Sequence, residues 1–175
     1  MNRNRKKKAF SLVELVIVIV ILGIIAAIAI PRISSGSRNA GESALRADLA
    51  SLRNAIDWYY GEHNNAFPGQ VTDGGNGPDT EGAFINQLTM YSNSSGEVTS
   101  NKDPDYPFGP YVRGTFPASP IGDNKGKATV TVVNQVGPLT STPGDGTGWV
   151  YNTKSGEIIA NTDDTANDGT TFDTW

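Results

Sequence analysis

The residue whose chemistry stands out first in this sequence is Glu14, a carboxylate inside an otherwise apolar stretch. The stretch runs from Phe10 to Ile30 and contains no other charged residue. A carboxylate at the centre of a lipid bilayer costs roughly 2.5 kcal/mol or more, and a buried charge is tolerated when an opposite charge pairs with it. Glu14 therefore predicts a partner charge, and that partner points to an assembly.

No other group of residues suggests catalysis. His63 is the single histidine and the chain has no cysteine. A lone histidine just past the end of a helix is expected at the surface, where its positive charge would interact favourably with the helix dipole. The turn-like segment 144–148 lacks the lysine and the following helix of a phosphate loop. With no arrangement of nucleophile and base either, we predict that the chain is not an enzyme.

A basic segment and a long apolar helix position Glu14. The basic residues that precede the apolar stretch are Arg3, Arg5, Lys6, Lys7 and Lys8. Such a cluster keeps its end of a membrane helix in the cytoplasm. Residues 10–30 would form a helix of about 31 Å, which matches a hydrocarbon core of roughly 30 Å. We therefore predict a single-pass membrane helix with a cytoplasmic N-terminus, although a generic signal anchor with an incidental Glu14 would look similar.

The helical pattern continues after the apolar stretch as an amphipathic segment. One apolar side chain recurs every three or four residues between residues 45 and 59, which is the spacing of one helix face. We predict a helical continuation over residues 31–61, with this stripe packed against a sheet. The residues of the stripe are Leu45, Leu49, Leu52, Ile56 and Tyr59.

Residues 62–175 are expected to form an α+β head domain. A short helix is expected near residues 82–88, and residues 127–134 alternate valine and threonine as a half-buried strand does. Segments 148–152 and 157–161 flank a glycine-containing turn, which predicts a C-terminal β-hairpin. The predicted fold class is thus α+β, with a long N-terminal membrane and amphipathic helix packed on a small antiparallel β-sheet.

Charge and composition narrow the functional classes. Five of the 14 basic residues lie within the first eight positions, so the rest of the chain carries nine basic residues and all 18 acidic ones. An acidic domain is a poor binder of nucleic acid, because phosphate neutralisation needs lysine and arginine. With no cysteine, the head cannot be closed by a disulfide.

The N-terminal segment resembles that of the type IV pilin superfamily, which carries the class III prepilin signal. The matching features are the basic leader 1–8, the motif 9–15, the apolar helix and Pro31. The resemblance implies that residues 1–9 are a leader, that a prepilin peptidase cuts between Ala9 and Phe10, and that Phe10 is then N-methylated. The family usually has glycine where this chain has Ala9. The new ammonium on Phe10 would lie on the same helix face as Glu14, four residues away, so the resemblance makes Glu14 the assembly residue.

Further along, the order of short motifs is similar to that of the major pseudopilin of type II secretion. These motifs are residues 67–68, 82–88, 109–112, 117–120 and the hairpin 149–158. The resemblance implies a structural filament subunit that moves exoproteins through an outer-membrane secretin. Its partners would be further copies, minor pseudopilins, the prepilin peptidase and an inner-membrane assembly platform, and its head would be periplasmic. The alternatives are a surface type IV pilin for adhesion or motility, which the missing disulfide disfavours, and a membrane-anchored enzyme or binding domain.

Members of this family often hold calcium in the C-terminal loop, so the resemblance also names candidate metal ligands. Carboxylate and amide oxygens suit calcium, although an acidic, solvated tail would have the same composition. The candidates are Asp163, Asp164, Asn167 and Asp168.

Overall fold

The computed structural model describes residues 11–175, apart from the side chains of residues 28–35. The chain divides into two compact units, Met1–Asn39 and Ala40–Trp175. The 51-residue helix α1 runs over Leu12–Glu62 and continues without interruption through Pro31, so the predicted long helix is confirmed. Among the described residues, no helix has a stretch both long and apolar enough to cross a membrane.

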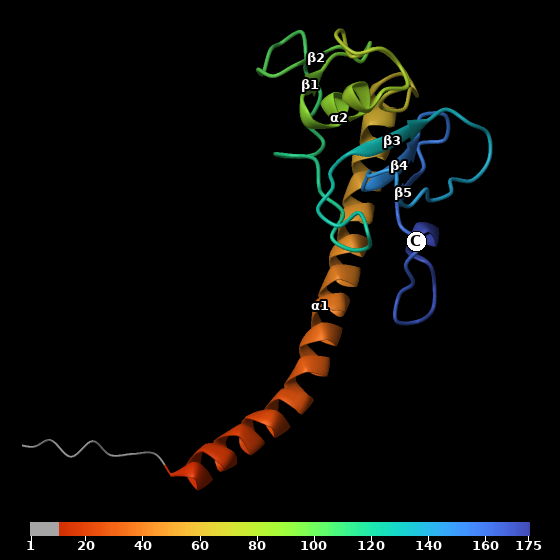
Figure 1. Cartoon of the computed structure of the whole chain (residues 1–175). Coiled ribbons are helices and arrows are strands. Elements are labelled where there is room, and N and C mark those ends of the chain that lie inside the picture. Colours follow the sequence, from red (N-terminus) through yellow and green to blue (C-terminus); the bar gives the residue numbers. More distant parts are fainter. Residues whose placement is uncertain (1–10) are drawn as a thin grey trace, which may run out of the picture. The chain divides into compact units, whose positions relative to one another are not determined.

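The end of α1 supplies the core of the second unit. All five residues of the predicted stripe, Leu45 to Tyr59, are buried with at most 1% of their surface exposed. They pack in one cluster with aromatic and aliphatic residues of the C-terminal strands, including Trp149, Tyr151 and Ile158. Figure 1 shows β3 and β4 lying beside this part of α1. Burial of this helix face against the sheet is what holds the head together.

The larger sheet is mixed and has the order β3-β4-β5. Strand β4 (Trp149–Asn152) pairs antiparallel with β5 (Ile158–Ala160), which confirms the predicted hairpin. Strand β3 (Val130–Val133), however, runs parallel to β4, whereas we expected three antiparallel strands. A parallel pair needs a crossover connection of about a dozen residues or more, and the segment 134–148 supplies it. The α+β fold class holds, with this difference in strand direction.

Both faces of the hairpin are covered, because its side chains alternate between two clusters. Trp149, Tyr151 and Ile158 face the cluster that contains α1. Val150 and Ile159 face the other way and pack with Leu139 of the crossover. The crossover therefore acts as a cover over the outer face of the sheet.

Polar side chains fasten this crossover to the end of β5. The Asn161 amide Nδ2 donates to Asp145 Oδ1 at 2.8 Å, and the Thr142 backbone N–H donates to Asn161 Oδ1 at 2.7 Å. Asp145 also accepts hydrogen bonds from Thr147 and Thr131. Burial disfavours ionisation of Asp145, but these hydrogen bonds outweigh it and lower its pKa to about 2. We call this set of contacts the Asp145–Asn161 clasp.

The remaining elements lie between α1 and β3 or at the C-terminal end. Helix α2 (Glu81–Thr89) confirms the expected short helix, and its first turn is capped by the Thr80 hydroxyl, which accepts from Ala83 N–H at 3.3 Å. Strands β1 (Tyr91–Ser92) and β2 (Val98–Thr99) form a small antiparallel pair. A 3-10 helix, η1 (Phe172–Thr174), ends the fold.

Candidate functional site

Glu14 lies in the first turn of α1, where it caps the helix of its own chain. The backbone N–H of Ser11, the residue before the helix, donates to Glu14 Oε2 at 2.9 Å. A glutamate that reaches back to this position forms one half of a capping box. The positive end of the helix dipole also favours a carboxylate here. Glu14 therefore has a local role in the single chain, which the sequence motif Ser11-x-x-Glu14 could have indicated.

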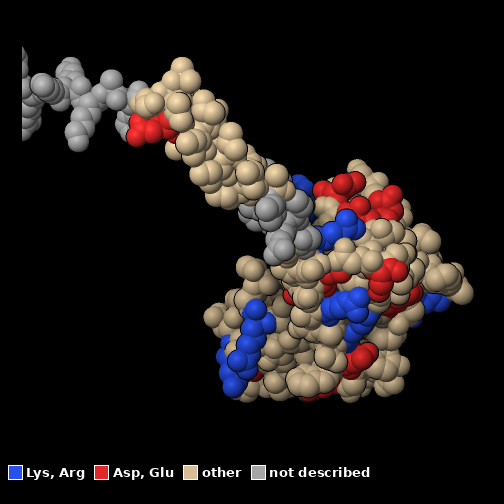
Figure 2. Space-filling view, turned by 90° about the horizontal axis from the view of Figure 1, so that it is seen from below, with Lys and Arg blue, Asp and Glu red and all other residues tan. Residues whose placement is uncertain are grey.

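The helix surface around Glu14 is apolar and open. Every large apolar residue from Leu12 to Ile25 is between 44% and 79% exposed. Figure 2 shows this stretch as an almost continuous surface without charge, apart from acidic atoms near its start. Monomeric soluble proteins rarely expose an apolar patch of this extent. This surface therefore needs lipid or other chains to cover it.

The predicted processing residues, Ala9 and Phe10, lie outside the residues that the structure describes. Cleavage between them and methylation of Phe10 therefore stay predictions.

The four predicted calcium ligands lie in the exposed loop after β5. Asp168 accepts hydrogen bonds from the Thr170 hydroxyl at 2.6 Å and the Thr170 N–H at 3.0 Å, and these contacts lower its pKa. Its carboxylate also lies 3.9 Å from the guanidinium of Arg46. Within the described part of the chain, no three histidine, cysteine, aspartate or glutamate side chains are grouped to hold a metal. The loop thus does not present these residues as a ready acidic ligand set, and calcium binding stays a prediction.

Asp173, which we did not select, has a buried side-chain oxygen without a partner. Its Oδ1 atom is buried and has no hydrogen-bond partner, while Oδ2 accepts from the Ser141 hydroxyl at 3.0 Å. A buried polar atom without a partner requires an explanation. No spacing in the sequence distinguishes Asp173 from the exposed aspartates near it.

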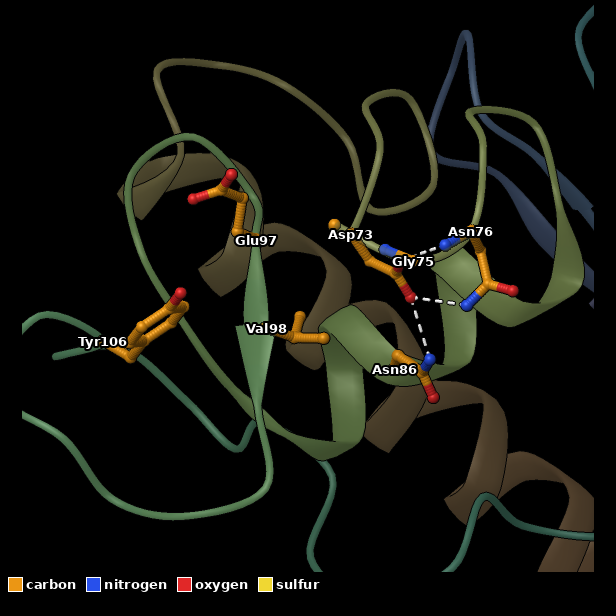
Figure 3. Close-up of a pocket in the computed structure, with 8 residues that line it drawn as sticks. Asp73, Gly75, Asn76, Asn86, Glu97, Val98 and Tyr106 are labelled. Carbon is orange, nitrogen blue, oxygen red and sulfur yellow. Dashed lines mark hydrogen bonds between the residues drawn. The ribbon is translucent and has the colours of Figure 1, made fainter.

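A polar pocket of about 430 Å³ lies between the loop 73–76 and strand β2. Asp73 points toward Asn76 and Asn86, with Glu97 and Tyr106 on the opposite side (Figure 3). Its carboxylate accepts hydrogen bonds from Gly75 N–H at 2.8 Å, from Asn76 N–H at 2.5 Å, and from the amides of Asn76 and Asn86 at 2.7 and 2.8 Å.

These bonds make Asp73 a structural anchor. The side chain is only 3% exposed. Burial alone would raise its pKa, but the hydrogen bonds from Asn76, Asn86 and Gly75 outweigh burial and lower the pKa to about 2. A carboxylate that accepts two or three donors in this way stays ionised. Asp73 therefore fixes the loop to α2 and is poorly suited to exchange protons near neutral pH.

His63 is buried, so the expectation of a surface histidine is wrong. It is 1% exposed, and its ring stacks on Tyr59 with 3.7 Å between ring centroids. Nδ1 lies 2.8 Å from the carbonyl oxygen of Tyr59, and Nε2 lies 3.0 Å from the Ser92 hydroxyl. Burial lowers its pKa, although Tyr59 and the nearby charge of Glu62 act in the opposite direction. His63 is buried because it contacts Ser92 and Phe108, which lie far from it in the sequence.

The lowered pKa of His63 predicts a loss of stability in weak acid. The unfolded chain takes up a proton near pH 6.5, while the folded chain takes it up only at a lower pH. The contribution of His63 is therefore complete above pH 6.5 and declines as the pH falls toward the lower value. We expect the melting temperature of the full chain in detergent to decrease as the pH falls below about 6.5.

In His63→Gln, this part of the pH dependence should disappear, because glutamine does not titrate. Near-UV circular dichroism at pH 7.5 reports whether the variant keeps the native packing. Equal slopes in the two proteins would show that other groups cause the acid sensitivity.

Comparison with known proteins finds similarity in part of the chain. Residues 4–30 match the family model described as the prokaryotic N-terminal methylation motif. The type II secretion system core protein G of Aeromonas hydrophila is 35% identical over 66 residues, which are 38% of this chain and 46% of that protein. Core protein G of Vibrio cholerae serotype O1 is 35% identical over 75 residues, or 43% and 49% of the two chains.

A longer alignment exists with core protein G of Klebsiella pneumoniae. It is 28% identical over 120 residues, which are 69% of this chain and 73% of that protein. The alignments with the first two relatives span about half of the length of those proteins. No solved structure matches the chain.

Together, the methylation motif at residues 4–30 and the long helix packed on a small sheet resemble the type IV pilin-like class of proteins. Within this class, the chain is similar to proteins named type II secretion system core protein G.

Proposed function

We propose that the chain is a structural subunit of a helical filament, a pseudopilin that moves exoproteins through an outer-membrane secretin. The observation that carries this proposal is the open apolar surface of residues 12–25, interrupted only by Glu14. In the membrane, lipid covers this surface, and in a filament the same surface of neighbouring subunits covers it. The chain therefore stays shielded during the transfer from one to the other, and it has no enzymatic role.

In this proposal, Glu14 determines the axial position of each subunit in the filament. The prepilin peptidase cuts between Ala9 and Phe10 and methylates the new terminus, and the resulting ammonium is the cation that Glu14 needs. Residues 10 and 14 share a helix face, so the ammonium of one subunit can pair with its own Glu14 or with that of a neighbour. Pairing between subunits favours one axial position, because a shifted subunit would leave both charges unpaired in an apolar surrounding.

The location follows from the same residues. The basic leader keeps the N-terminus in the cytoplasm, residues 10–30 cross the inner membrane once, and the head lies in the periplasm. The inner-membrane assembly platform then extracts the subunits into the filament, together with minor pseudopilins. The acidic head supports binding to proteins in preference to nucleic acid.

Deletion of the gene from the bacterium that carries it tests the function. We expect exoproteins to disappear from the culture medium and to accumulate in the periplasm, because the filament no longer drives them through the secretin. Surface pili, counted by electron microscopy, should remain. Normal secretion together with the loss of surface filaments would show instead that the chain is a surface type IV pilin. Re-expression of the intact chain provides the control.

A further inference from the structure

Two large apolar side chains of the second unit lie open to solvent. Trp58 is 72% exposed and Val136 is 84% exposed. In the described structure, these are the exposed large hydrophobic residues between residues 40 and 175. Because both are largely exposed, neither covers the other within one chain.

Trp58 stands between two hollows on the surface of α1. One hollow, of about 360 Å³, is lined by Ser51, Asn54, Ala55, Trp58 and Tyr111. The other, of about 270 Å³, is lined by Trp58, Glu62 and the segment 107–111. The Tyr111 hydroxyl donates to the Glu62 carboxylate, which places an acidic group at the edge. We call this surface the Trp58 patch.

Val136 projects from a rigidly held part of the crossover. The buried side chain of Asn152 makes two hydrogen bonds with the backbone of Gln135, the residue before Val136. Its Nδ2 donates to Gln135 O at 3.0 Å, and its Oδ1 accepts from Gln135 N–H at 3.4 Å. The same Oδ1 accepts from Lys154 N–H at 3.0 Å. The backbone N–H groups of Lys154 and Gln135 therefore share one acceptor, which places the exposed residue Lys154 near Val136 in the fold. We call Val136 and Lys154 the Val136 knob.

We propose that the Val136 knob of one subunit docks on the Trp58 patch of the next subunit, with Lys154 opposite Glu62. This inference rests on the proposed filament. A helical filament joins subunits through two different faces of each chain. Both the knob and the patch expose a large apolar side chain, and Lys154 and Glu62 carry opposite charges. Exposed tryptophans flanked by pockets are frequent anchors of protein interfaces, and opposite charges at the edge orient the partners.

Cysteine cross-linking tests this contact directly, because the natural chain has no cysteine. In Ser51→Cys/Gln135→Cys, both Trp58 and Val136 remain in place, and each subunit carries one thiol near the patch and one near the knob. Oxidation of filaments of this variant should give a ladder of dimers, trimers and longer chains on non-reducing gels. Each single-cysteine variant should stay monomeric, because its thiol meets no partner.

Reversal of the edge charges gives a second, independent readout. Glu62→Lys and Lys154→Glu should each lower filament yield by about tenfold or more, because like charges then meet. The combined variant should restore the yield. Asp123→Lys reverses an exposed carboxylate that lines neither hollow, and it should leave the yield unchanged.

The outcomes separate this contact from the proposed function. Filaments that form without a cross-linked ladder, or a combined charge variant that stays defective, would overturn the contact and leave the filament intact. If the unaltered chain forms no filament under conditions of assembly, the proposed function itself fails.

Discussion

Filaments are expected to disappear when Glu14 is replaced by alanine, while the protein still inserts into the membrane. The variant leaves the Phe10 ammonium without a partner in an apolar surrounding. An unpaired charge of this kind costs roughly 3 kcal/mol at the centre of a membrane helix, and about 3 kcal/mol corresponds to a factor of about a hundred in each binding step. Electron microscopy of sheared fractions measures the filament yield. Mass spectrometry should find Phe10 as the mature N-terminus in variant and parent alike.

Glu14→Gln is the matched control, because it separates the two roles of this residue. Glutamine can still accept the hydrogen bond that Ser11 N–H donates, but it carries no charge. We expect Glu14→Gln to be as defective as Glu14→Ala, and Glu14→Asp to be less so. Normal filaments from the glutamine variant would show that helix capping, and not charge pairing, is what assembly requires.

Replacement of Asp73 by alanine is expected to give the largest loss of stability in the head. The variant leaves two backbone N–H groups and two side-chain amides without their acceptor. Buried donors without partners cost about 1–3 kcal/mol each when water cannot replace the acceptor. We expect a total of about 3 kcal/mol, because the loop can relax toward solvent, and a melting temperature lower by about 10 °C.

Asp145→Ala tests how much of this loss of stability depends on burial of the carboxylate. Asp145 also accepts several hydrogen bonds, but it lies at an exposed position. Water can replace the lost acceptor there, so we expect a clearly smaller decrease. Equal losses in the two variants would mean that the hydrogen bonds and not their burial determine the cost.

The low pKa of Asp73 also predicts a loss of stability in strong acid. Its pKa is about 2 in the folded chain and near 3.8 in the unfolded chain. The stability that Asp73 contributes is therefore complete above pH 3.8 and is lost as the pH falls toward 2. Asp73→Asn should remove this part of the acid dependence. The decline that His63 causes begins at higher pH, near 6.5, and His63→Gln removes it separately.

Elements with a regular apolar period were predictable from the sequence. The stripe from Leu45 to Tyr59 has the period of a helix, and burial follows from it directly. The hairpin of β4 and β5 has alternating side chains around a glycine turn. In both cases, the residues that determine the element lie within about fifteen positions of each other, so local pattern is sufficient.

Features that depend on distant residues were not predictable. The parallel direction of β3 follows from how the crossover returns, and the sequence of Val130–Val133 is equally compatible with either direction. His63 is buried by Ser92, Phe108 and Tyr111, which lie about thirty to fifty positions away. For the candidate site, Glu14 was found because one charge interrupts an apolar run. The Asp73 loop has the composition of a turn, but its bond to Asn86 comes from a separate helix.

The Asp145–Asn161 clasp has a consequence for how the head folds in the cell. It ties the crossover to the end of β5 with hydrogen bonds alone, in a chain that contains no cysteine. The closure therefore responds to protons and not to thiol oxidants or reductants. Formation of this closure therefore requires no thiol oxidase.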